Sequence, residues 1–132
     1  MLDDPRAVAM LEAVSRLMRE TLIPALPPDV VFQARVAANA VDLVLRELRT
    51  GAQLEEAAHA RLTALLGQDA PLDTLEAALC HRIREGAVDL ADPALLDHLW
   101  STTMAKMSID QPAYASYRRE LEARAEEKPA NG

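Results

Sequence analysis

Prolines and glycines divide this 132-residue chain into segments of helical length, and no segment shows the alternating pattern of a β-strand. Alanine and leucine, which favour helices over strands, make up about a third of the residues. One short stretch, 87–90, approaches a strand pattern but has no second strand to pair with. We therefore predict an all-α fold, a single-domain bundle of about five to six helices with short connections.

Caps and helix breakers place the expected helices at 5–22, 28–49, 53–66, 71–86, 93–107 and from 112 into the charged C-terminal tail. Asp3 or Asp4 is the expected N-cap of the first helix. Gly51 is the expected C-terminal stop of the second helix. Asp92 and Asp110 each precede a proline at short distance and are expected N-caps of the last two helices.

The length, composition and charge of the chain limit the classes of protein to which it can belong. We expect one helical domain over 1–127 and a flexible C-terminal tail over 128–132. A single cysteine excludes a disulfide scaffold, and Cys80 is expected to be a small, semi-buried apolar residue. No apolar run is long enough to span a membrane, and the acidic N-terminus does not resemble a secretory signal, so we expect a cytoplasmic protein. The net charge of −7 argues against nucleic-acid binding.

The expected second helix is apolar around most of its circumference, as is typical of a central helix in a bundle. One narrow polar stripe interrupts it, formed by Arg35, Asn39, Asp42 and Arg46. One interpretation is a solvated face on which Arg35 or Arg46 pairs with Asp42. The other is a polar cluster at the mouth of the bundle or in an interface with a partner.

Histidines give no catalytic or metal-binding set. Glu56 and His59 share a helix face, but a di-iron bundle needs this pair on two helices, so we predict no metal. His98 and Thr102 lie four residues apart and can hydrogen-bond, although no third orienting group accompanies them. We predict no cofactor and no catalytic residue, and an enzyme that uses His98 or His59 as a base is the least favoured function.

Unusual residues are concentrated between Leu99 and Tyr117. Three of the four aromatic residues and one of the two lysines lie there. In one interpretation Trp100, Met104 and Met107 form a core stripe. In the other, a surface made by Lys106, Asp110 and Tyr114 binds a partner or an anionic ligand, since tyrosine and tryptophan are common at binding hot spots.

Four segments together resemble a family of small, all-helical bacterial proteins of unknown function: Asp3–Arg6, Phe32–Asn39, Leu79–Ile83 and Lys106–Tyr114. The resemblance covers nearly the whole chain except the last dozen residues. Members of that family are often encoded beside, or fused to, kinases that resemble aminoglycoside phosphotransferases, near acyl-CoA dehydrogenases. The resemblance implies an accessory role in acyl-CoA metabolism and no established catalytic residue.

We therefore expect a non-catalytic accessory or interaction protein whose partner is a phosphotransferase-like kinase or a second copy of the chain. The alternative is a module that binds an anionic acyl or CoA-type ligand through Arg35, Arg46 or Lys106. The candidate surface for either function comprises Arg35, Asn39, Asp42, Lys106, Asp110 and Tyr114.

Overall fold

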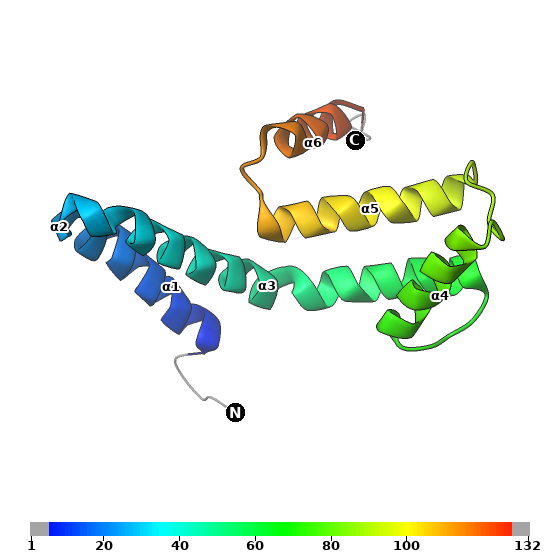
Figure 1. The fold of residues 1–132 in the computed structure, drawn as a ribbon, viewed down its shortest axis with the longest axis horizontal. Coiled ribbons are helices and arrows are strands. Elements are labelled where there is room, and N and C mark those ends of the chain that lie inside the picture. Colours follow the sequence, from blue (N-terminus) through cyan, green and yellow to red (C-terminus); the bar gives the residue numbers. More distant parts are fainter. Residues whose placement is uncertain (1–5, 128–132) are drawn as a thin grey trace, which may run out of the picture. The chain divides into compact units, whose positions relative to one another are not determined.

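The computed structural model describes residues 6–127, and within that range the chain forms helices and no strands (Figure 1). The predicted all-α class is therefore confirmed. The elements are α1 (Ala7–Leu17), the π-helix η1 (Met18–Leu22), α2 (Ile23–Ala25), α3 (Pro28–Leu66), α4 (Leu72–Arg84), α5 (Pro93–Asp110) and α6 (Ala115–Glu127). The chain divides into two compact units, 1–52 and 53–132.

The first unit is a helical hairpin. α1, η1 and α2 follow one another without a break, and after a short turn the first part of α3 runs back alongside them (Figure 1). The residues buried between the two arms include Ser15 of α1 and Ala38 and Leu45 of α3. Two of these three side chains are small, which allows the arms to pack closely.

Pro24 explains why a π-helical turn lies in this hairpin. A proline inside a helix has no N–H to donate, and its ring clashes with the carbonyl group four residues earlier. Immediately before Pro24, the N–H of Ile23 donates to the carbonyl of Met18, five residues back. The wider turn absorbs the proline without ending the helix, which continues to Ala25.

Gly51 does not end a helix, so the predicted stop at this position is wrong. The expected second and third helices are one helix, α3, which continues from Pro28 to Leu66. Positive φ values, which mark glycine at helix ends, occur at Gly67 and Gly86 among the described glycines and not at Gly51. Good helix formers such as Leu48, Arg49 and Ala52 lie close to Gly51, and they outweigh the cost of about 1 kcal/mol that glycine imposes relative to alanine.

The core of the second unit is a cluster of leucines from three helices. Leu62 and Leu66 of α3 pack with Leu75 and Leu79 of α4 and with Leu95 of α5. Three of them, Leu62, Leu75 and Leu95, are at most 1% exposed. This cluster contains most of the fully buried apolar side chains in the described part of the chain.

The helix ends in this unit confirm some sequence predictions and correct others. Asp92 caps α5 as predicted, since its carboxylate accepts a hydrogen bond from the N–H of Ala94 at 2.9 Å. Asp110, by contrast, is the last residue of α5 rather than the cap of the next helix. The backbone leaves the helical conformation at Gln111, since Pro112 disfavours helical geometry in the residue before it, and α6 begins only at Ala115.

Cys80 is exposed rather than semi-buried, because the buried face of α4 is formed by Leu75 and Leu79. The predicted caps Asp3 and Asp4 and the predicted tail over 128–132 lie outside the described residues. None of the helices between residues 6 and 127 combines the length and apolar content that a membrane crossing requires.

Candidate functional site

A network of polar side chains joins the two arms of the hairpin. Arg19 of η1 donates through Nη2 to Asp42 Oδ2 at 2.5 Å and to Asn39 Oδ1 at 2.8 Å. Its Nε donates to the same Asp42 oxygen at 3.1 Å. Ser15 completes the network by donating to Asp42 Oδ1 at 2.5 Å. The polar stripe of α3 therefore faces polar groups of the first arm, and the ion-pair partner of Asp42 is Arg19.

The network holds Asp42 in its ionised form. Partial burial on its own raises the pKa of this carboxyl group. The hydrogen bonds from Ser15 and Arg19, with the positive charges of Arg19 and Arg46, outweigh that effect, and the pKa of Asp42 lies below its usual value. Arg19 and Asp42 thus largely neutralise each other.

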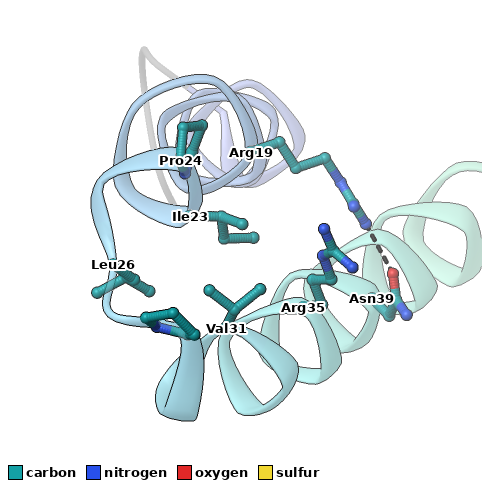
Figure 2. Close-up of a pocket in the computed structure, with 8 residues that line it drawn as sticks. Arg19, Ile23, Pro24, Leu26, Val31, Arg35 and Asn39 are labelled. Atoms are coloured by element: carbon teal, nitrogen blue, oxygen red, sulfur yellow. Dashed lines mark hydrogen bonds between the residues drawn. The ribbon is translucent and has the colours of Figure 1, made fainter.

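A pocket of about 700 Å³ opens beside this network, between the η1–α2 segment and α3 (Figure 2). We call it the hairpin pocket; its lining residues are Arg19, Ile23, Pro24, Leu26, Pro28, Val31, Arg35 and Asn39. Two arginines and one asparagine form its polar side, and the other five side chains are apolar. The first unit therefore holds a cavity with one cationic and one apolar side.

The predicted site residues fall into two groups. Arg35 and Asn39 line the hairpin pocket, and Asp42 is joined to Asn39 through Arg19. The other three, Lys106, Asp110 and Tyr114, belong to the second unit and have exposed side chains. The candidate surface as a whole remains a prediction.

Tyr114 lines a second cavity, which we call the aromatic pocket. It measures about 550 Å³, lies between α5 and α6, and is lined by Trp100, Thr103, Met104, Met107, Tyr114, Ser116, Tyr117, Arg119, Glu120 and Ala123. Trp100 is 45% exposed and Tyr114 is 53% exposed. The predicted core stripe of Trp100, Met104 and Met107 is therefore wrong: Trp100 is not buried, and all three line this open pocket.

Charged groups lie at the edge of the aromatic pocket. The guanidinium of Arg124 lies over the ring of Trp100, 5.8 Å from its centroid, and also pairs with Glu120 at 2.9 Å. Arg119 hydrogen-bonds to Ser116 and has no ion-pair partner in the described part of the chain. The edge therefore carries a net positive charge, although the chain as a whole is acidic.

The histidines have different surroundings. His59 Nε2 lies 2.9 Å from the carbonyl oxygen of Ala70 and 3.2 Å from Asp69 Oδ1. His98 is only 4% exposed, and burial together with the positive charge of Arg61 lowers its pKa. Neither His98 Nδ1 nor Thr102 Oγ1 has a hydrogen-bond partner in the part of the chain that the structure describes, so the two do not form the bond that their spacing predicted.

Ser15 and Arg19 are the members of the polar network that the sequence analysis missed. They lie four residues apart and therefore on one face of the first helical arm. A serine and an arginine on the face that also carries Leu11 and Met18 are the signal that was available. Their partners on α3 could not be assigned, because sequence spacing within one helix does not fix the register between two helices.

Comparison with known families adds one result. A family model described as a domain of unknown function (DUF6285) matches residues 24–114. The chain belongs to the DUF6285 family. The part that matches DUF6285 includes Arg35 and Asn39 of the hairpin pocket and all the α5 residues that line the aromatic pocket, whereas Arg19 precedes it. No protein of curated function and no solved structure matches the chain significantly.

Between residues 6 and 127 no group of three or more His, Cys, Asp or Glu residues is placed to hold a metal ion.

Proposed function

We propose that this chain is a cytoplasmic accessory protein that binds a protein partner through the aromatic pocket. The observation that carries the proposal is the exposure of Trp100 and Tyr114 at a cavity where methionine and aromatic side chains form half of the lining residues. Tryptophan and tyrosine supply much of the binding energy in protein interfaces, and methionine adapts its shape to different partners. A cavity of this size accepts one or two apolar side chains of a partner helix.

The charge at the edge of the pocket specifies the partner further. Glu120 is paired with Arg124, whereas Arg119 keeps its positive charge without a carboxylate partner in the described residues. A partner segment with an apolar side chain beside an acidic one is complementary to this arrangement. Following the family resemblance, we propose that this segment belongs to a phosphotransferase-like kinase that acts in acyl-CoA metabolism.

The experiment is co-expression of the chain with such a kinase from the same genome, followed by size-exclusion chromatography and kinase assays. We expect the two proteins to elute together at micromolar concentration. Trp100→Ala should weaken the complex roughly thirtyfold, as removal of a hot-spot side chain does. Phe32→Ala is the matched control, because Phe32 is an aromatic side chain in the other unit and is 76% exposed.

Two outcomes contradict the proposal. One is separate elution of the two proteins with unchanged kinase activity. The other is an equal loss of binding in the Trp100→Ala and Phe32→Ala variants. Sedimentation of the chain alone tests the second predicted partner, another copy of the chain, since a dimer held by the aromatic pocket dissociates in the Trp100→Ala variant.

The alternative function, a module for an anionic acyl or CoA-type ligand, is favoured by a separate observation. The two arginines of the hairpin pocket lie beside apolar side chains, which suits a ligand with a charged head and a hydrocarbon body. Because this pocket lies in the first unit, the Trp100→Ala variant leaves it intact.

A further inference from the structure

The hairpin pocket contains a cation, Arg35, that none of the described residues neutralises. Arg35 makes no ion pair or side-chain hydrogen bond with any residue between 6 and 127, whereas Arg19 is fixed by Asp42 and Asn39. Figure 2 shows Arg35 rising from α3 on the side that Arg19 reaches from η1. No described carboxylate is among the lining residues of the pocket. The pocket therefore keeps a net positive charge in a chain whose net charge is −7.

Asn39 adds a directed donor to the same side of the pocket. Its Oδ1 accepts the hydrogen bond from Arg19, so its Nδ2 group, which can only donate, is left for another partner. A guanidinium and an amide N–H₂ group one helical turn apart on α3 can both donate to one oxyanion. Arginine is the side chain best suited to this, because its planar fork matches the two oxygens of a carboxylate or a phosphate.

The rest of the pocket is lined by apolar side chains from both arms of the hairpin and the turn between them. Ile23, Leu26 and Val31 line it together with two prolines, whose rings restrict backbone motion. The volume of about 700 Å³ lies within the range of small-molecule sites, which hold an apolar body and orient it with a few polar groups.

From these observations we propose that the hairpin pocket binds an amphipathic anion, with its carboxylate or phosphate on Arg35 and Asn39 and its hydrocarbon chain on Ile23, Leu26 and Val31. This assigns a site and a ligand chemistry to the alternative ligand-binding function, and it does not depend on the protein partner. A failure here therefore leaves the kinase complex and the Trp100→Ala result unaffected.

Calorimetry and thermal shift with defined probes test the site. Octanoate and octyl phosphate should bind the wild-type chain and raise its melting temperature, whereas octylamine should not. Each added CH₂ group between butanoate and octanoate should tighten binding by up to about fourfold, because it transfers apolar surface from water to the pocket. Comparison of octanoate, octyl phosphate and octanoyl-CoA identifies which head group the arginine side prefers.

Two variants locate the binding site. Arg35→Gln removes the free charge and should weaken octanoate binding at least tenfold. Asn39→Asp keeps an acceptor for Arg19 but places a negative charge beside the ligand, and it should weaken binding as strongly while leaving the hairpin folded by circular dichroism. Arg118→Gln, a matched loss of one exposed arginine on α6, should bind like the wild type.

Three results would overturn the proposal. In the first, neither octanoate, octyl phosphate nor octanoyl-CoA binds the wild type. In the second, Arg35→Gln binds octanoate as tightly as Arg118→Gln does. In the third, inorganic phosphate binds as tightly as octyl phosphate, which would show that the apolar side contributes nothing.

Discussion

Arg19 and Asp42 form an ion pair, with 2.5 Å between Nη2 and Oδ2, although 23 residues separate them in the chain. The pair fixes the register of the two arms of the hairpin, and Ser15 and Asn39 each add a hydrogen bond to it. Arg35, two turns before Asp42 on α3, takes no part in this network and makes no ion pair with any residue between 6 and 127.

Asp42→Asn should destabilise the hairpin by about 1–3 kcal/mol, because it removes charge-assisted hydrogen bonds from Arg19 and Ser15. The pKa of Asp42 is lowered in the folded protein. Its contribution to stability is therefore complete above the pKa of the unfolded chain and is lost as the pH falls through the folded value. Urea unfolding between pH 2 and 6 should show a shallower acid loss in Asp42→Asn than in the wild type. Glu55→Gln, a change at an exposed carboxylate without a partner among the described residues, should leave stability at neutral pH within about 0.5 kcal/mol of the wild type.

His98 should make the second unit sensitive to mild acid. Burial and the charge of Arg61 lower its pKa, while Glu76 and Asp97 act in the opposite direction. Because the unfolded chain binds the proton first, stability is complete above about pH 6.5 and falls as the pH drops from there toward the folded value. His98→Leu should remove this loss in denaturant titrations between pH 5 and 7.5. The control variant His81→Gln, at an exposed histidine, should retain this loss of stability in mild acid. Equal pH dependence in the two variants would contradict the assignment of the loss to His98.

Leu75→Ala should cost about 2–5 kcal/mol, as expected for truncation of a fully buried leucine that leaves a cavity. Leu75 of α4 is 0% exposed and belongs to the leucine cluster, together with leucines of α3 and α5. Leu90→Ala makes the same chemical change at a side chain that is 67% exposed, and it should leave stability within about 0.5 kcal/mol of the wild type. Equal losses in the two variants would show that this cluster is not the core.

Gly51→Ala should stabilise the chain by about 0.5–1 kcal/mol, because alanine favours the helical conformation of α3. The added Cβ meets only the flexible carboxylate end of Glu47, which can move away. Gly67→Ala should have the opposite effect, because Gly67 has a φ of 67°, which alanine adopts only with strain. Thermal unfolding of the two variants checks the signs. Destabilisation by Gly51→Ala would contradict the helical conformation of Gly51 inside α3.

The sequence predicted local features well where one residue sets the geometry. Asp92 before Pro93 predicted the start of α5, and the predicted helix ends at 66 and 86 lie within two residues of the ends of α3 and α4. The sequence predictions failed at Gly51 and at Asp110, because the neighbouring residues decide whether a helix ends at a given position. Of the candidate site, the polar stripe on α3 was visible from spacing, but its partner Arg19 was not, because the pairing depends on how two helices meet.

The sequence by itself determined that the chain is helical and where most helices begin and end, since alanine, leucine, proline and capping residues act within a few residues of their own position. Only the tertiary structure decided which groups are neutralised and which remain free. Asp42 pairs with Arg19, while Arg35 in the hairpin pocket has no ion-pair partner among residues 6–127, and Trp100 faces an open cavity instead of a core. These outcomes depend on packing between helices, where burial and charge are set by residues distant in the chain.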